Sequence, residues 1–257
     1  MNVLAIIQAR MGSSRLPGKV LLKINKKTLL EILIERIRRS KYINKICVAT
    51  TMRIEDSVLY SHVSSLGVEC FRGSENDVLS RFYFCAKNND PHLIVRITAD
   101  DPLKDPDVID SIILEMINDE SLDYCSNTLV PTFPEGLDVE VFKFKALEIA
   151  FQEALLESER EHVTPYIWKN NQKFNLKNIF CNYKFPNCRL TVDYYEDYLF
   201  IKKMIEMFDN SMLINCQDIA NILISNPKIL SLSSNIPRNE GYLRSLNREK
   251  ECKNDNK

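Results

Sequence analysis

Glycine, tryptophan and histidine are scarce in this chain of 257 residues, which has six glycines, one tryptophan and three histidines. A chain that uses glycine so rarely places it where the backbone needs a positive φ angle or the close approach of a ligand. Gly12 and Gly18 fall within one short window near the N-terminus, whereas Gly73 and Gly136 lie in other polar segments typical of turns. The first window is therefore the leading candidate for a ligand-binding loop.

Long apolar runs are also missing. No segment reaches the roughly 18 apolar residues that a membrane-spanning helix needs. The first ten residues, MNVLAIIQAR, contain a short apolar run without the basic start and the small-residue cleavage site of a secretory signal. We therefore expect a cytoplasmic protein that does not engage a membrane.

The chain has no excess of charge of either sign, since 34 Lys and Arg oppose 35 Asp and Glu and the formal net charge is −1. General binding of nucleic acid requires clustered cations that neutralise phosphates. The balance therefore argues against nucleic acid as a partner. Any site for a polyanion must be a local concentration of Lys and Arg.

The eight cysteines form no CxxC pair, and the histidines do not cluster with them at the spacing of zinc ligands. Most cysteines lie within apolar runs such as KICVAT and LDYCSN. In a long chain without a secretory signal, this pattern predicts reduced, buried thiols rather than disulfides or a zinc site.

Strands and helices alternate at short spacing through the first half of the chain. Apolar runs predict strands at 3–8, 45–51, 68–71 and 92–98, and helical periodicity or position predicts helices at 28–40, 54–65, 75–87 and 107–118. This alternation predicts an α/β fold with a doubly wound, mainly parallel, twisted sheet of the Rossmann-like kind. Ligands of such sheets bind beyond the carboxyl ends of the strands, so the loops after Gln8, Phe71 and Thr98 should face one crevice.

The pattern changes after about Asp119. We expect strands at 122–126, 138–142 and 189–192, an antiparallel strand at 173–183, and helices at 145–157, 160–169, 195–208 and 217–225. Residues 1–246 are predicted to form one domain, with a small antiparallel extension at about 127–187. The charged residues 247–257 are predicted to be a disordered tail.

The segment QARMGSSRLPGK, residues 8–19, concentrates three cations, two glycines and two serines. Glycines let successive backbone N–H groups converge on phosphate oxygens, and Arg10, Arg15 and Lys19 supply the charge that a triphosphate needs. Val20 follows where a Walker loop requires Ser or Thr, and the GxGxxG pattern of dinucleotide-binding loops is absent. The residues alone favour phosphate binding over the alternative, a solvated basic turn.

This loop resembles the signature of the cytidylyltransferases that activate acidic sugars, such as the 3-deoxy-manno-octulosonate and acylneuraminate enzymes. The resemblance is closer to the spore coat polysaccharide biosynthesis protein F group. It continues, in order and over nearly the whole chain, through FRGSENDVLSRF, VRITADDPLKDPDVID, PEGLDVEVF, SEREHVTPYI, LTVDYYEDY and RNEGYLRSL. It implies a fold like that of nucleotide-diphospho-sugar transferases.

The resemblance also implies roles for individual residues around the nucleotide. Arg10 and Lys19 are implied as catalytic cations of the triphosphate loop, and Ala9, Gly12, Ser13 and Arg15 as further nucleotide-binding positions. Arg72 and Ser74, on either side of Gly73, form a second polar loop that we expect to contact the base or ribose. Thr98 and Arg96 are expected near the base, although Arg96 is equally well interpreted as a structural ion pair.

Magnesium is the cofactor that the resemblance implies, held by two acidic positions that match Asp100 in TADDP and Asp193 in LTVD. Mg²⁺ is commonly bound by a few carboxylates together with phosphate oxygens and water. Asp101 is the rival to Asp100, whereas Asp105 and Asp107 precede a predicted helix and are better interpreted as helix caps.

The acceptor is expected to contact the middle of the chain, where the candidates are Asn127, Glu135, Asp138, Glu140, Arg160 and His162. Asp138 and Glu140 share one face of a predicted strand, because side chains alternate with a period of two, and could bind sugar hydroxyls or a second metal. His162 is interpreted either as a base towards the acceptor hydroxyl or as a satisfied helix residue. The segment 238–241 matches the same group but receives no role.

The activity implied is transfer of CMP from CTP to an acidic sugar for surface glycan synthesis, with release of pyrophosphate by in-line displacement at the α-phosphorus. One alternative is a phosphorylated or phosphonate acceptor or another nucleoside triphosphate, because Gln8 replaces the proline of the older family. Another is a non-catalytic nucleotide sensor, which has no need of two metal carboxylates. The resemblance implies a homodimer, and no cysteine is needed as a nucleophile, so Ser in place of Cys47 or Cys85 should leave the chemistry intact.

Overall fold

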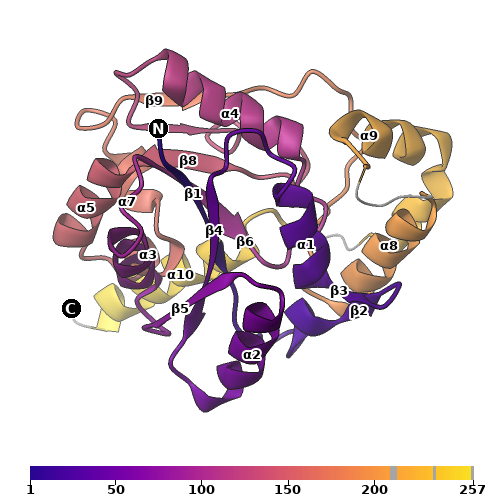
Figure 1. Cartoon of the computed structure of the whole chain (residues 1–257), viewed down its shortest axis with the longest axis horizontal. Helices are drawn as coiled ribbons and strands as arrows, with labels where there is room; N and C mark the ends of the chain where they lie inside the picture. Colours follow the sequence, from indigo (N-terminus) through magenta and orange to yellow (C-terminus); the bar gives the residue numbers. More distant parts are fainter. Residues whose placement is uncertain (209–212, 234–235, 256–257) are drawn as a thin grey trace.

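The protein is built around one seven-stranded sheet with the strand order β5-β4-β1-β6-β8-β7-β9 (Figure 1). The computed structural model describes residues 1–208, 213–233 and 236–255. The strands of the sheet are β1 (Val3–Gln8), β4 (Lys45–Thr51), β5 (Glu69–Gly73), β6 (Leu93–Thr98), β7 (Tyr124–Ser126), β8 (Glu140–Lys143) and β9 (Leu176–Asn178), and β2 (Lys23–Ile24) pairs with β3 (Lys27–Thr28) in a separate hairpin.

Strands β5, β4, β1 and β6 run parallel to one another, whereas β8 is antiparallel to both β6 and β7. Strand β9 completes the sheet beside β7 and runs parallel to it. The prediction of a mainly parallel α/β sheet is therefore confirmed. The antiparallel part begins where the alternation in the sequence stops.

Helices lie on both faces of the sheet. They are α1 (Leu29–Ile37), α2 (Ser57–Ser65), α3 (Val78–Lys87), α4 (Pro106–Asn118), α5 (Phe144–Glu153), α6 (Glu157–His162), α7 (Pro165–Lys169), α8 (Tyr195–Glu206), α9 (Cys216–Ser225) and α10 (Glu240–Asp255). Short 3₁₀ helices occur at Lys19–Leu21, Ile54–Asp56 and Pro227–Leu232. No helix of the described residues is both long and apolar enough to cross a bilayer.

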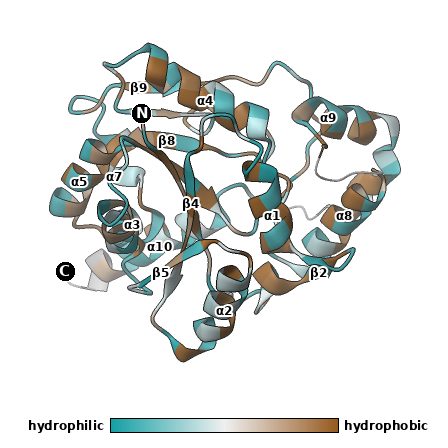
Figure 2. Cartoon of the chain, in the orientation of Figure 1, coloured by the Kyte–Doolittle hydropathy of each residue, from teal (hydrophilic) through white to brown (hydrophobic). Residues whose placement is uncertain are grey.

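Alternating side chains of β1 divide the core into two layers. Ala5 and Ile7 pack with residues of α1, α2, α4, α8 and α9, whereas Leu4 and Ile6 pack with residues of α3, α5 and α7. A strand that buries both of its faces reads as one continuous apolar run, as VLAIIQ does. In Figure 2 the hydrophobic colour accordingly runs along the central strands.

Two helices begin where local capping chemistry predicts. Thr28 caps α1 by accepting a hydrogen bond from the Glu31 N–H, and Glu31 accepts one from the Thr28 N–H in return. Asp105 caps α4 by accepting from the Asp107 N–H at 2.8 Å, with Pro106 in the first turn. The interpretation of Asp105 as a helix cap is confirmed.

Three expectations for the second half of the chain are wrong. Of residues 173–183, only Leu176–Asn178 form a strand of the sheet, and this strand is parallel rather than antiparallel to its neighbour. The strand is short because the chain then turns, and the Cys181 N–H donates to the Thr132 hydroxyl. Residues 189–192 form one isolated bridge, between Arg189 and Glu135, rather than a strand. The described part of the predicted disordered tail, 247–255, belongs to helix α10, and residues 256–257 lie outside the described residues.

Candidate active site

Three distant parts of the chain meet at the side chain of Lys19. Its Nζ atom lies 2.6 Å from Oδ2 of Asp100, which follows β6, and 2.8 Å from Oδ1 of Asp193, which precedes α8. Gly18 has a φ angle of 70°, and its N–H donates to the Met11 carbonyl at 2.9 Å, so the loop folds back on itself just before Lys19. One ammonium group therefore bridges two carboxylates.

Backbone contacts carry Asp193 to this position. The Val192 N–H donates to the Asp100 carbonyl at 2.9 Å, and the Leu190 N–H donates to the Glu135 carbonyl at 2.6 Å. The segment thus runs between the loop after β6 and the loop before β8 instead of joining the sheet. This is the physical reason why the strand expected at 189–192 does not form.

The charges of the cluster stabilise one another. Burial alone would lower the pKa of Lys19, but the attraction of Asp100 and Asp193 outweighs burial and raises it. Burial would raise the pKa of Asp193, but Lys19 and Arg15 lower it to about 2. Arg15 and Arg189 both form ion pairs with Asp193, so this carboxylate stays ionised in the presence of three cations.

Two cavities meet at this cluster. The loop cavity, of about 1050 Å³, lies against residues 8–20, and the carboxylate cavity, of about 400 Å³, is rich in acidic side chains. The residues that line both cavities are Gln8, Arg15, Thr98, Asp100, His162, Asp193 and Gly241. The two cavities therefore adjoin at Asp100 and Asp193.

The loop cavity collects the polar loops at the carboxyl ends of the parallel strands. Residues from the loops after β1, β5 and β6 line it: Ala9, Arg10, Ser13, Arg15 and Lys19 from the first, Glu75 and Asn76 from the second, and Ala99 and Asp100 from the third. The predicted common crevice is confirmed. Arg10 is nearly half exposed and lies 3.8 Å from Glu75, so its guanidinium is available to a ligand.

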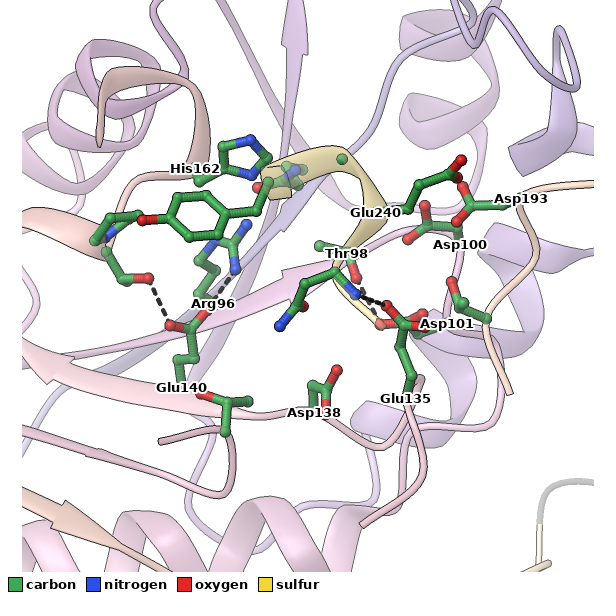
Figure 3. Close-up of a pocket in the computed structure, with 18 of the residues that line it drawn as sticks. Arg96, Thr98, Asp100, Asp101, Glu135, Asp138, Glu140, His162, Asp193 and Glu240 are labelled. Carbon is green, nitrogen blue, oxygen red and sulfur yellow. Dashed lines mark hydrogen bonds and ion pairs between the residues drawn. The ribbon is translucent and has the colours of Figure 1, made fainter. Parts of the chain in front are cut away.

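The carboxylate cavity is shown in Figure 3, where Glu135, Asp138 and Glu140 lie on one wall and Asp100, Asp193 and Glu240 on another. Glu140 forms an ion pair with Arg96 and accepts hydrogen bonds from Tyr124 Oη at 2.7 Å and Thr164 Oγ1 at 2.5 Å. Burial raises the pKa of Glu135 to about 7 and that of Asp138 to about 6. This wall is therefore a set of hydrogen-bonding carboxyl groups with little spare positive charge.

The cations that line the carboxylate cavity are held by carboxylates. Arg96 pairs with Glu140, and Lys104 lies 2.8 Å from Asp101. Arg15 pairs with Asp193 and with Glu240. An anionic ligand would have to displace one of these internal partners.

Four of the predicted ligand-binding residues make contacts within the protein. Arg72 donates to the backbone carbonyls of Thr51 at 2.9 Å and Arg53 at 2.6 Å, and its guanidinium lies over the Tyr60 ring. Ser74 accepts from the Asp77 N–H at the start of α3. Neither side chain is among the described residues that line the loop cavity or the carboxylate cavity, and their contact with base or ribose stays a prediction.

Asn127 and Arg160 are likewise occupied away from the cavities. Asn127 is fully buried and bridges the Leu137 carbonyl and the Val139 N–H, at 2.9 and 2.8 Å. Arg160 pairs with Asp77 and donates to the Ala154 carbonyl at 3.0 Å. Amide and guanidinium groups with such complete sets of partners hold loops together, and the role of both residues in acceptor binding stays a prediction.

The remaining predicted positions lie at the cavities with one exception. Thr98 and His162 line both chambers, and Asp138 and Glu140 line the carboxylate cavity. Gly12 does not line the loop cavity as described, and a Cβ added there would meet nothing within 4 Å. The space beside Gly12 is open, and its role in nucleotide binding stays a prediction.

Sequence reasoning missed the contribution of α10. Glu240 accepts a hydrogen bond from Arg15 at 3.0 Å, and Gly241, Arg244 and Arg248 line the loop cavity. The signal was the RNEG segment at 238–241, which matched the resembled group but was left without a role. Glu75 and Asn76 were missed next to Ser74 in the segment GSEN.

The donor set fits a magnesium ion that is also bound by phosphate. Among the described residues there is no group of three or more His, Cys, Asp or Glu side chains suited to a metal. Two facing carboxylates, those of Asp100 and Asp193, match the few protein ligands that Mg²⁺ takes when phosphate oxygens and water complete its octahedron. The ammonium of Lys19 between them shows that this position accepts positive charge.

Comparisons with known proteins identify relatives of the whole chain. The chain is 40% identical to an uncharacterized protein of Methanocaldococcus jannaschii over 247 residues, covering 94% of this chain and 98% of the relative. It is 34% identical to the spore coat polysaccharide biosynthesis protein SpsF of Bacillus subtilis over 233 residues, covering 88% of this chain and 95% of the relative.

Among solved structures, a cytidylyltransferase from Leptospira borgpetersenii superposes with a TM-score of 0.86 at 34% identity, covering 92% of this chain and all of that one. A CMP:2-keto-3-deoxy-manno-octonic acid synthetase solved with CTP shares the fold, with a TM-score of 0.63 at 17% identity over 80% of this chain and 99% of that one. The family model described as cytidylyltransferase matches residues 4–235. The chain therefore belongs to the cytidylyltransferase family and is a nucleotidyltransferase enzyme.

Proposed function

We propose that the protein transfers CMP from CTP to a hydroxyl group of a sugar-type acceptor and releases pyrophosphate, with Mg²⁺ as cofactor. The observation that carries this proposal is the bridge from Lys19 to Asp100 and Asp193 at the junction of the two cavities. A reaction between two substrates at one phosphorus is favoured when both are held close together in the correct orientation, and adjoining cavities with cations and carboxylates between them suit this.

The loop cavity suits the nucleoside triphosphate. Arg10, Arg15 and Lys19 lie along it with the Ser13 hydroxyl, and together they can neutralise the charge that develops on departing pyrophosphate. When bound by Asp100 and Asp193, magnesium would act as a Lewis acid on the phosphates and help to orient them. Lys19 is nine-tenths buried, so its interaction with a phosphate would be weakly screened by solvent.

The carboxylate cavity suits a ligand with several hydroxyl groups. Carboxylates, threonine hydroxyls and the rings of Trp168 and Tyr242 line it, and such groups accept hydrogen bonds from hydroxyls and pack against a sugar ring. The names of the relatives, a spore coat polysaccharide biosynthesis protein and octulosonate cytidylyltransferases, support a sugar-type acceptor.

Each described lysine and arginine that lines the carboxylate cavity, namely Arg15, Arg96 and Lys104, is paired with an internal carboxylate, and Glu135 and Asp138 line the same cavity. We therefore expect the acceptor to present hydroxyl groups to these carboxylates. An acidic acceptor would bind by displacing one of the internal partners, as the triphosphate would at Arg15 and Lys19.

His162 is not arranged as a base. Burial, with a smaller effect from Arg96, lowers its pKa to about 4, and its Nε2 atom lies 3.0 Å from Ser245 Oγ. A ring with a lowered pKa and a hydroxyl partner at Nε2 is a weak proton acceptor. The interpretation of His162 as a satisfied helix residue is the one that this geometry favours.

Measurement of pyrophosphate release tests the proposal. The purified protein would be incubated with magnesium, each of the four common ribonucleoside triphosphates, and panels of neutral, acidic, phosphorylated and phosphonate acceptors. We expect release with CTP and a neutral, hydroxyl-rich sugar. Release only with another triphosphate, or only with a phosphorylated or phosphonate acceptor, would overturn the donor or the acceptor assignment. Nucleotide binding without release under every condition would favour a sensor.

The proposal includes a homodimer, which is the assembly implied by the sequence resemblance. Sedimentation equilibrium of the full chain would give its mass in solution. A monomer at all concentrations used for activity would contradict this part without affecting the chemistry.

A further inference from the structure

Helix α10 forms a wall of both cavities although it lies outside the matched family region, which ends at residue 235. Glu240, Gly241 and Tyr242 line the carboxylate cavity, and Gly241, Arg244 and Arg248 line the loop cavity. In Figure 3, Glu240 lies beside Asp193 and Asp100. The helix therefore reaches the junction at which the reaction is proposed to occur.

Contacts near the start and in the middle of this segment hold α10 in place. Before the helix, Arg238 pairs with Asp138 and donates to the Phe133 carbonyl at 2.7 Å. Within it, the fully buried Ser245 contacts Nε2 of His162 at 3.0 Å and Oε2 of Glu161 at 2.6 Å. The position of α10 relative to the cavities is thus fixed by the protein itself.

Glu240 holds the guanidinium of Arg15 in one orientation. Oε2 of Glu240 accepts from Nη1 of Arg15 at 3.0 Å, while Nη2 of Arg15 pairs with Asp193 and the guanidinium lies 5.4 Å from the centre of the Tyr194 ring. The Tyr194 hydroxyl donates in turn to Glu240 at 3.2 Å. Because two nitrogens of the planar guanidinium each contact a carboxylate, both the plane and the position of the group are fixed.

Arg244 adds a cation to the loop cavity from the side of α10. Its Nη2 atom lies 2.5 Å from Oε1 of Glu240, and half of its side chain is exposed. Arg244 pairs with Glu240 through one nitrogen, and its half-exposed side chain lines the same cavity as residues 9–19. A triphosphate bound there would have cations on two walls, Arg10 and Lys19 on one and Arg244 on the other.

We propose that α10 is part of the active site, with Arg244 as a residue that binds the triphosphate and Glu240 as a positioning residue for Arg15. This inference rests on the proposed function, because it assigns the loop cavity to a nucleoside triphosphate. It adds residues of α10 to the site, and these residues follow residue 235, where the match to the family model ends.

The first test replaces Arg244 with Ala and compares it with Lys250→Ala. Lys250 is an exposed cation on the same helix and lies outside the described lining of both cavities. Loss of one charge-assisted hydrogen bond to phosphate should raise the KM for the triphosphate roughly 10-fold or more in Arg244→Ala. The KM of Lys250→Ala should equal that of the wild type, and thermal melting would show that both variants are folded.

The second test asks whether Glu240 acts through Arg15. We expect Glu240→Gln to lower kcat/KM for the triphosphate, and to have no further effect when it is added to Arg15→Ala. A merely structural glutamate would lower the melting temperature and act equally in both backgrounds, so this double-mutant cycle separates the two roles.

The outcomes for α10 and for the proposed function can be told apart. If the wild type releases pyrophosphate and Arg244→Ala behaves like Lys250→Ala, the inference about α10 is overturned and the proposed function stands. If the wild type releases none with any triphosphate, the proposed function fails. Calorimetric titration of CTP into the same variants then decides about α10, because unchanged affinity in Arg244→Ala overturns the inference and a roughly 10-fold loss supports it.

Discussion

The ammonium group of Lys19 lies 2.8 Å from the carboxylate of Asp193, although 174 positions separate the two residues along the chain. The contact exists only because the glycine-containing loop after β1 and the irregular segment before α8 both reach the carboxyl end of β6. Asp100, at that end, accepts from the same ammonium group at 2.6 Å. Charge, rather than regular secondary structure, therefore joins the parts of the proposed active site.

Replacement of Lys19 with Met should abolish most of the activity. The variant keeps the length of the side chain but removes the buried cation that would stabilise departing pyrophosphate, so kcat/KM should fall by roughly 10²–10³-fold, as when a single preorganised charge-stabilising donor is removed. Pyrophosphate release at saturating magnesium would measure the loss. Lys41→Met, at an exposed lysine, is the matched control and should keep wild-type activity.

Removal of divalent metal should stop turnover without unfolding the protein. Dialysis against a chelator should abolish pyrophosphate release, and added Mg²⁺ should restore it, because Asp100 and Asp193 offer oxygen ligands suited to that ion. Asp100→Asn should raise the magnesium concentration needed for half-maximal activity. The exposed Asp107, replaced with Asn, should not change it. Full activity in the chelator would contradict a magnesium mechanism.

Protonation of His162 should lower the free energy of unfolding in mild acid. Burial, with a smaller effect from Arg96, lowers its pKa from 6.5 to about 4, so the unfolded chain binds this proton more readily than the folded chain. The resulting stability is present above pH 6.5 and is lost as the pH falls through about 4. Its upper limit is roughly 3 kcal/mol, since each pKa unit corresponds to 1.36 kcal/mol.

Urea unfolding at pH 7 and pH 4.5 would measure this contribution in the wild type and in His162→Asn. The variant should lose less of its free energy of unfolding between the two pH values than the wild type does. Equal losses would show that His162 does not titrate as its surroundings imply. The pH profile of kcat should contain no inflection from this residue near its ordinary pKa, because the neutral ring is the folded form there.

Cysteine chemistry should not contribute to turnover. Cys47 and Cys85 are buried with their Sγ atoms 3.3 Å apart, and neither is among the described residues that line a cavity. The hydrogen bond with Cys47, together with burial, strongly raises the pKa of Cys85 and disfavours a reactive thiolate. Ser at either position should leave kcat unchanged in folded protein, as measured by pyrophosphate release. A complete loss in a folded variant would indicate a role that this geometry does not provide.

Regular elements of the first half of the chain were predictable because periodicity and capping are local properties. The apolar run of β1, the strand β4 and the Thr28 cap of α1 depend on neighbours within a few residues. The loop of residues 8–19 could be singled out as a candidate site for the same reason, since its cations and glycines are close in sequence. Asp100 and Asp193 came from the family resemblance, and no spacing in the sequence links them.

The sequence did not reveal contacts between residues that are separated along the chain. Arg72 and Arg160 look like ligand-binding cations in the sequence, and the structure adds that Arg72 donates to the carbonyls of Thr51 and Arg53 and that Arg160 pairs with Asp77. The polar composition of residues 247–255 predicts disorder, yet α10 is held by Ser245 and by the ion pairs of Arg248 with Glu157 and Glu161. Composition does not reveal such anchors, because each depends on a residue about 80 positions away.

Gly136 should be indispensable for both folding and activity. Its φ angle is 102°, and a Cβ added there would lie 2.4 Å from the Leu190 carbonyl carbon and 2.7 Å from the Thr191 nitrogen. These atoms belong to the backbone that carries Asp193 to Lys19, so they cannot move aside without displacing the proposed metal ligand. Gly136→Ala should therefore cost roughly 2–4 kcal/mol of unfolding free energy, in the range of large strain effects.

The melting temperature and pyrophosphate release of Gly136→Ala would be compared with those of Gly12→Ala. A Cβ at Gly12 meets nothing within 4 Å, so this control should melt like the wild type. Where Gly136→Ala still folds, its magnesium requirement should rise because Asp193 is shifted relative to Asp100, and this change separates a displaced ligand from lost stability alone. A melting temperature of Gly136→Ala equal to that of the wild type would mean that the backbone of residues 190–193 can move aside. The path of this backbone would then not fix the distance between the carboxylates of Asp100 and Asp193.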